Sequence, residues 1–94
     1  VFIGANSWVG LATADPAASE GALIFAPFTP ADPRPEVRRF VEAFTKAYGR
    51  APSSHAALAY DATLAIAAAI EAVGTERAAV RDHIARIGAR APVQ

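Results

Sequence analysis

One stretch of this 94-residue chain constrains its fold more than any other. Residues 56–73 form an almost unbroken apolar run rich in alanine, with Ser53 and Ser54 before it and Gly74 after it. A serine before such a run and a glycine after it are the usual start and stop signals of a helix, so we expect a helix from Ser54 to Val73. Because this helix is apolar on nearly every side, it requires packing partners on several sides.

The same run has the length of a membrane-spanning helix, but its composition favours a different environment. It carries Tyr60, Asp61 and Glu71, and most of its apolar residues are alanines rather than large side chains. These features favour a buried helix of a soluble domain over a membrane span.

Two short strands are expected before this helix. Residues 1–4 and 22–26 are runs of β-branched, aromatic and other apolar residues bounded by turn-forming residues. Between them, residues 8–14 fit at most one loose helical turn, which ends at Asp15 because a residue before proline avoids the helical region. Two strands do not make an independently stable sheet, so this part also requires further partners.

Two more helices flank the apolar one. Prolines at 27, 30, 33 and 35 mark an extended connector that leads into a helix. Asp32 is the expected N-cap of this helix, with Pro33 in its first turn. Apolar residues at helical spacing continue to Tyr48, and Gly49 is expected to end this helix. The last helix is expected to start at Thr75 and to end at Gly88.

The sequence therefore predicts an α/β fold class, with two strands followed by three helices that form only part of a larger body. We expect the isolated chain to be marginally stable, or to associate through its uncovered apolar surface. His83 lies on the apolar face of the last helix and is interpreted as a packed core or edge histidine.

Composition argues against several functions. Lys and Arg total 9, and so do Asp and Glu, so the net charge is zero and the basic surface of a nucleic-acid-binding protein is absent. The chain has no cysteine, which excludes disulfides and thiolate metal sites. No phosphate-binding, nucleophile or zinc-ligand motif occurs. We therefore expect no enzyme activity, no catalytic residue, no cofactor and no metal.

Five segments, in this order and at these spacings, resemble a known family. They lie at residues 2–7, 18–22, 33–52, 57–62 and 80–82, and read FIGANS, ASEGA, PRPEVRRFVEAFTKAYGRAP, ALAYDA and VRD. Together they resemble the type I periplasmic solute-binding proteins of branched-chain amino-acid (leucine/isoleucine/valine-binding) ABC transporters. The resemblance covers nearly the whole chain and implies an interior to C-terminal fragment, cut at both ends.

The resemblance implies a two-lobed Venus-flytrap fold, with a ligand bound in a cleft between the lobes. Residues 1–27 would supply a strand, a loop and a hinge-crossing strand of the second lobe, and residues 28–94 mainly helices of the first. The implied function is the periplasmic or other extracytoplasmic solute-binding component of a bacterial ABC transporter. The implied partners are a small-molecule ligand, a membrane permease, and the remainder of the parent chain or a second copy covering the apolar surface.

Two alternatives stay open. One is a ligand-sensing effector domain of a sensor or transcription regulator with the same fold, which an attached DNA-binding or signalling module would reveal. The other is a free-standing helical interaction module.

Four residues are expected to contact the ligand: Asn6, Ser7, Trp8 and His55. Asn6 follows the first strand, where open α/β sheets present ligand-binding loops, although it also suits a plain turn. The family often carries a carboxylate here against a ligand ammonium, and Asn6 departs from that pattern. Trp8 would wall the ligand or pack in a core, and His55 would approach from the other lobe or remain a solvated residue at the start of a helix.

Overall fold

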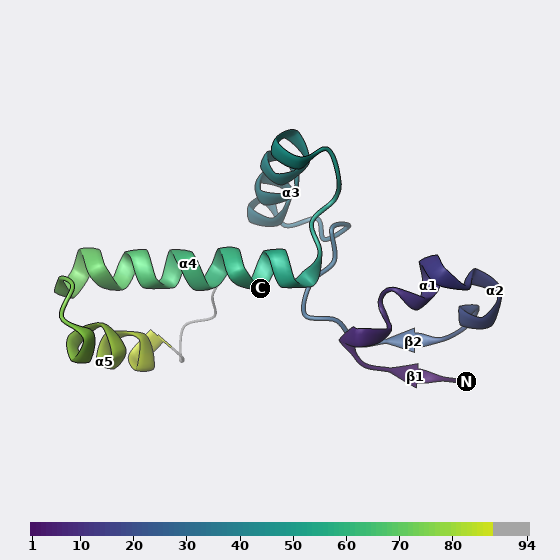
Figure 1. Cartoon of the computed structure of the whole chain (residues 1–94), viewed down its shortest axis with the longest axis horizontal. Helices are drawn as coiled ribbons and strands as arrows, with labels where there is room; N and C mark the ends of the chain where they lie inside the picture. Colours follow the sequence, from purple (N-terminus) through teal and green to yellow (C-terminus); the bar gives the residue numbers. More distant parts are fainter. Residues whose placement is uncertain (88–94) are drawn as a thin grey trace.

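A computed structural model describes residues 1–87 of the chain. Its elements in order are β1 (Ile3–Gly4), η1 (Asn6–Trp8), α1 (Leu11–Ala14), α2 (Pro16–Ser19), β2 (Leu23–Ile24), α3 (Pro35–Tyr48), α4 (Ser54–Val73) and α5 (Arg77–Ile87). We call residues 1–27 the N-terminal unit, residues 28–34 the connector and residues 35–87 the helical unit. Figure 1 shows the two units side by side, joined by the connector.

The two predicted strands are confirmed, although each is only two residues long. They pair in parallel, with Ile3 opposite Leu23 and Gly4 opposite Ile24. The chain between them crosses back through η1, α1 and α2, as a parallel pair requires a crossover connection. Ile3 and Leu23 are both more than half exposed, so the sheet has little cover within this chain.

The loop between the strands is more helical than the sequence analysis predicts. α1 is the expected single turn, but α2 was missed. The Asp15 carboxylate accepts a hydrogen bond from the Ala18 N–H at 3.0 Å, and Pro16 occupies the first turn of α2. Asp15 and Pro16 thus end one helical turn and begin another, since a proline is tolerated at the first position of a helix.

The predicted start of α3 is wrong. Asp32 does not cap the helix, which begins at Pro35 after Arg34. The Asp32 carboxylate instead accepts hydrogen bonds from the Arg34 guanidinium, the shortest at 2.8 Å, and from the Arg34 backbone N–H at 2.9 Å. These hydrogen bonds lower the pKa of Asp32 and raise that of Arg34. The predicted end is confirmed, because Gly49 has φ 70° and its N–H donates to the Thr45 carbonyl.

α4 runs between the predicted limits. The Ser53 hydroxyl accepts from the Ala56 N–H at 3.2 Å and caps the helix, while Gly74, with φ 80°, ends it. For α5 the predicted cap, Thr75, is wrong by one residue. The Glu76 carboxylate accepts from the Ala78 and Ala79 N–H groups at 3.1 and 2.9 Å. The predicted end at Gly88 lies outside the described residues.

A small core sits where α3, α4 and the connector meet. Val37 and Ala57 are buried there, and Phe40 is the centre of an aromatic cluster. The Phe40 ring lies 4.7 Å from Tyr60 and 5.9 Å from both Phe28 and Phe44 between centroids. These rings fix α3 against α4 and hold the connector beside both helices.

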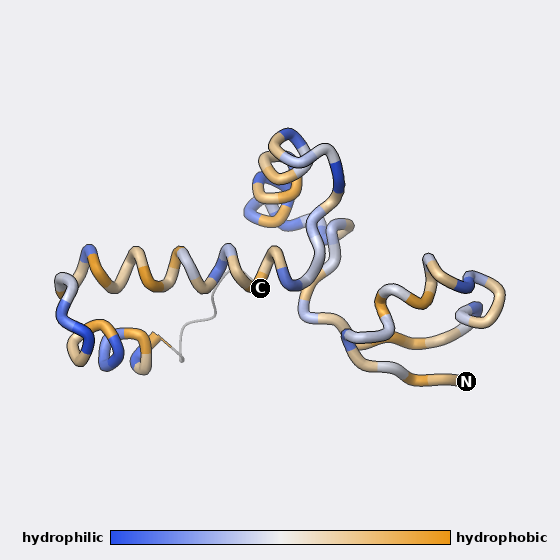
Figure 2. The backbone as a smooth tube through the Cα atoms, viewed as in Figure 1, coloured by the Kyte–Doolittle hydropathy of each residue, from blue (hydrophilic) through white to orange (hydrophobic). Residues whose placement is uncertain are grey.

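α4 is otherwise largely uncovered by the described part of the chain. Leu58, Leu64, Ile66 and Ile70 are 37–48% exposed, and the orange segments of the tube in Figure 2 recur along the whole helix. By length and composition alone α4 could cross a membrane. The burial that the sequence predicts for this helix is thus not provided by residues 1–87.

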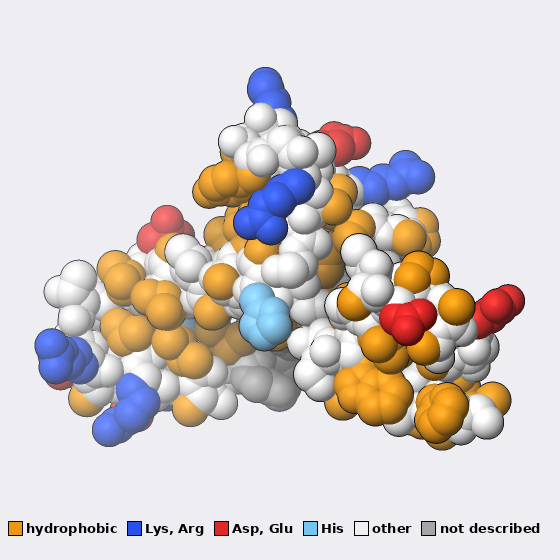
Figure 3. Space-filling view, turned by 45° about the vertical axis from the view of Figure 1, so that its right-hand side comes forward, with side chains coloured by type: hydrophobic (Ala, Val, Ile, Leu, Met, Phe, Trp, Pro, Cys, Tyr) orange, Lys and Arg blue, Asp and Glu red, His pale blue; other side chains and the backbone are white. Residues whose placement is uncertain are grey.

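The whole chain exposes 7074 Å², whereas a compact protein of its mass exposes about 5,100 Å². Figure 3 shows apolar side chains spread over the visible surface of both units. The structure is therefore a small α/β assembly of two parallel strands and three longer helices, with more exposed surface than a compact domain of its mass presents.

Candidate functional site

The turn after β1 positions the first two predicted ligand residues. β1 ends at Gly4, Ala5 is extended, and the chain then tightens into η1. The Trp8 N–H donates to the Ala5 carbonyl at 2.9 Å, and the Val9 N–H donates to the Asn6 carbonyl at 3.1 Å. These two bonds hold Asn6 and Ser7 at the carboxyl end of β1. Asn6 is half-buried and Ser7 is exposed.

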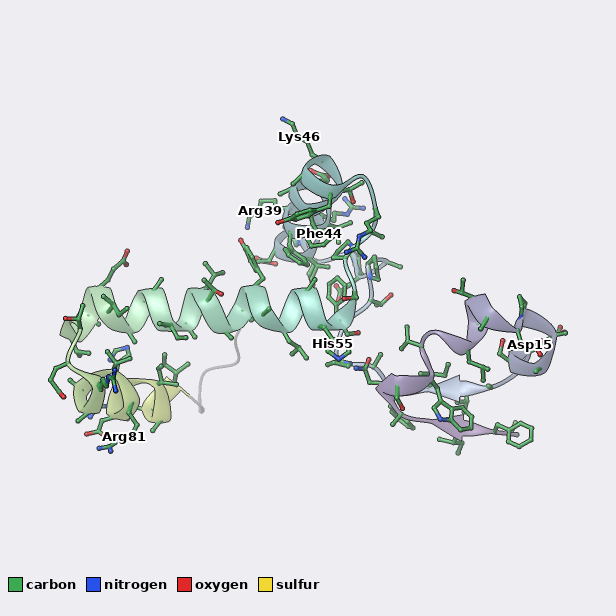
Figure 4. All side chains as sticks on the ribbon, viewed as in Figure 1. Asp15, Arg39, Phe44, Lys46, His55 and Arg81 are labelled. Carbon is green, nitrogen blue, oxygen red and sulfur yellow. The ribbon has the colours of Figure 1, made fainter. Side chains whose placement is uncertain are left out.

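The start of α4 positions another predicted ligand residue, His55. Ser53 caps the helix, and the exposed His55 lies in its first turn. Beside it, the buried Ser54 donates its hydroxyl to the Phe28 carbonyl of the connector at 3.5 Å, which is a long hydrogen bond. Figure 4 shows His55 at the end of α4 that faces the N-terminal unit.

A groove of about 620 Å³ lies between these two regions. Its volume suits a small organic molecule. The structure brings Asn6, Ser7 and His55 together along it, although they come from different units. The full lining consists of Asn6, Ser7, Val9, Gly10, Thr13, Phe28, Pro30, Ala51, Pro52, Ser53, Ser54 and His55.

The groove contains polar residues that the sequence analysis missed. Thr13, Ser53 and Ser54 add hydroxyl groups, and Phe28 and Pro30 of the connector add an apolar wall. The sequence analysis interpreted Ser53 and Ser54 only as the start signal of a helix and did not expect them to contact a ligand. Thr13 lies in the crossover and Phe28 and Pro30 lie in the connector, and nothing in the sequence indicates that they line a site.

Trp8 does not line this groove. Its ring lies directly over Gly4, and it borders a separate hollow of about 260 Å³ with Phe2, Leu11, Ala18 and Ala22. This placement favours the packing interpretation of Trp8 over contact with a ligand in the groove. Trp8 instead packs against Gly4 within the N-terminal unit and stays partly exposed.

Two other cavities are less suited to a ligand. One, of about 20 Å³ between the connector, α3 and α4, has room for little more than one water molecule. The other is an open apolar depression of about 450 Å³ between α3 and α4, lined mainly by alanines and by the rings of Phe40, Phe44, Tyr48 and Tyr60. Among residues 1–87, no group of three or more His, Cys, Asp or Glu side chains is placed to hold a metal.

The groove lies between an α/β unit and a helical unit and has polar side chains from both along it, which is a place where ligand pockets are common. The comparison with protein families identifies the family. The family model described as periplasmic binding protein matches residues 2–92, and the chain belongs to this family. Its members are generally solute-binding proteins rather than enzymes. No curated protein and no solved structure matches the chain significantly.

Proposed function

We propose that this chain is part of the extracytoplasmic solute-binding component of a bacterial ABC transporter. In this proposal the N-terminal unit belongs to one lobe and residues 28–94 mainly to the other, and a small amino-acid-like or other organic ligand binds between them. A membrane permease receives the ligand from the complete protein. Family membership supports the solute-binding role.

The observation that carries the proposal is the meeting of Asn6 and Ser7 with His55 along one groove. These residues are separated by almost fifty positions in the sequence and belong to units joined by a single connector. Closure of the two units around a ligand would bring the polar side chains of both into contact with it, as in hinged binding proteins. Asn6 supplies a donor and an acceptor, Ser7 a hydroxyl, and His55 an imidazole.

Calorimetric titration of the full-length protein against a panel of small amino acids, amides and alcohols tests the proposal. Replacing Asn6 by Ala removes its hydrogen bonds and is expected to weaken binding by about 1–3 kcal/mol. His55→Ala is expected to weaken binding as well, because it removes a contact from the opposite side of the groove.

Arg38→Ala is the matched control, since Arg38 lies exposed on α3 and does not line the groove. Unchanged affinity in both groove variants, with their folds intact, would show that the groove is not the ligand site.

A further inference from the structure

We infer that the ligand of this groove is uncharged and is held through hydroxyl or carboxamide groups. The inference rests on the proposed function and narrows it, because an amino-acid zwitterion and a free carboxylate are then not the preferred ligands. It is carried by the chemistry of the groove lining.

The lining is largely apolar, and none of its polar side chains carries a permanent charge. Its polar side chains are one amide, four hydroxyls and one imidazole, supplied by Asn6, Ser7, Thr13, Ser53, Ser54 and His55. Among the described residues that form the groove there is no Asp, Glu, Lys or Arg. Uncharged hydrogen-bonding groups of this kind pair well with amides and alcohols, which need both donors and acceptors.

Ionisable side chains near the lining in the sequence have partners elsewhere. Asp15, two residues after Thr13, accepts from the Ala18 N–H. Asp32, two residues after Pro30, is paired with Arg34 at 2.8 Å. The Arg50 guanidinium lies 6.0 Å from the centre of the Phe44 ring, which is a cation–π distance. None of these groups lines the groove, so none provides a counter-charge for a ligand there.

The lining residues of this chain therefore offer a charged ligand no ion pair to offset the hydration that it loses on entering the groove. Burying a charge without a partner is strongly unfavourable, whereas a neutral amide or hydroxyl needs only hydrogen bonds. The amino-terminal end of α4 offers a partial positive charge, but a helix end typically changes the affinity of an anion only a few-fold. Ser53 also satisfies one of the free N–H groups at that end.

Asn6 is the residue that best distinguishes these ligand types. Its side chain presents a carbonyl oxygen and an NH₂ group side by side, so it can donate to and accept from a carboxamide at once. The same position occupied by a carboxylate would attract an ammonium group through a charge-assisted bond, about twice as strong as a neutral one. Phe28 and Pro30 leave room for an apolar part of the ligand.

The test uses five compounds that share one branched apolar chain and differ in their polar groups. Isocaproamide and isohexanol are uncharged, isocaproate is an anion, isohexylamine is a cation, and leucine is a zwitterion. Each is titrated calorimetrically into the full-length protein at low and at high salt. We expect the amide or the alcohol to bind about tenfold or more tightly than the three charged compounds. We also expect little dependence of this binding on salt.

The isosteric variant Asn6→Asp sharpens the test, because it changes charge with almost no change in shape. In this variant we expect the ratio of the affinity for isohexylamine to the affinity for isocaproamide to rise by about tenfold. Ser7→Ala is the companion variant, which should weaken the uncharged ligand without creating a preference for the amine.

The outcomes separate the two proposals. Tighter or equal binding of isocaproate, isohexylamine or leucine to the native protein would overturn the inference while leaving the proposed binding function intact. An unchanged preference in Asn6→Asp would also overturn it, since position 6 would then not face the ligand. Failure of all five compounds to bind would count against the proposed function and the inference together.

Discussion

Gly4 is the residue on which the geometry of the candidate site depends most directly. It is buried at the end of β1, and the Trp8 ring covers its Cα so closely that a β-carbon there would overlap the ring. Gly4 does not have a positive φ. Glycine is required at this position by the close approach of the indole rather than by the backbone conformation.

Gly4→Ala is therefore expected to displace the Trp8 ring and loosen the turn that holds Asn6 and Ser7. Trp8 is the only tryptophan of the chain, so its fluorescence reports on this site alone. We expect a red-shifted emission maximum in Gly4→Ala and weaker ligand binding by the full-length protein. Gly10→Ala is the control for the fluorescence change only, because a β-carbon at Gly10 meets no atom within 4 Å although Gly10 lines the groove. An unchanged emission spectrum in Gly4→Ala would show that Trp8 does not rest on Gly4.

At the scale of single elements, α5 depends on one carboxylate at its start. Glu76 accepts from two backbone N–H groups of the first turn, and these hydrogen bonds lower its pKa below the ordinary value. A carboxylate here also interacts favourably with the helix dipole. The ionised form of Glu76 is thus the one that stabilises α5.

The pH dependence follows from the direction of this shift. Because the pKa of Glu76 is lower in the folded than in the unfolded chain, its contribution is complete above the unfolded value, near pH 4.3. It is lost as the pH falls through the lower folded value. We expect the helical circular dichroism of the native chain to fall more between pH 5 and pH 2 than that of Glu76→Gln, which retains an oxygen acceptor but has no proton to gain. Identical acid titrations of the two would contradict this role.

The sequence predicted helix ends well where a residue type has one dominant structural role, as glycine has at the end of a helix. Gly49 and Gly74 end α3 and α4 as predicted, because both have a positive φ. The caps were harder to predict, since acidic and hydroxyl residues compete for them. The Asp32 carboxylate pairs with the Arg34 guanidinium instead of capping α3. Glu76, rather than Thr75, accepts hydrogen bonds from the free N–H groups at the start of α5.

The lining of the candidate groove could be predicted only in part. The strand end indicated Asn6 and Ser7, and the resemblance indicated His55, all of which line the groove. Trp8 follows the same strand end, but a side chain that packs back onto Gly4 cannot be distinguished in sequence from one that faces a ligand. Thr13, Phe28 and Pro30 reach the groove only through the path of the crossover and connector, which sequence spacing does not determine.

At the scale of the whole molecule, the extent of uncovered surface is the dominant feature. The radius of gyration is 16.6 Å, against about 12.4 Å for a compact domain of this length. The exposed area exceeds the compact value by about 2,000 Å², which is more than one partner loses in a standard protein–protein interface. Much of this surface is apolar and lies on α4 and the two strands. We therefore expect further protein surface to cover α4 in the native environment of this chain.

The substitution Ile66→Asp tests whether α4 is covered in the full-length protein. Ile66 is 48% exposed in residues 1–87, so in the isolated chain an aspartate at this position stays in water and costs little beyond helix propensity. If other parts of the full-length protein cover α4, the same aspartate is buried without a partner, and the free energy of unfolding should fall by about 2–4 kcal/mol. Denaturant titration measures this loss in the full-length protein. Arg38→Asp, on the charged face of α3, is the control for introducing an aspartate into a helix.

In the isolated chain Ile66→Asp should be favourable, because it should reduce association rather than lower stability. Its uncovered apolar surface favours association, so sedimentation velocity of the native chain is expected to show species larger than a monomer. Ile66→Asp places a charge in that surface and should shift the chain toward monomer, because association would bury an unpaired carboxylate. A native chain that sediments as a compact monomer, together with a full-length Ile66→Asp protein as stable as the Arg38→Asp control, would show that α4 faces solvent and needs no cover.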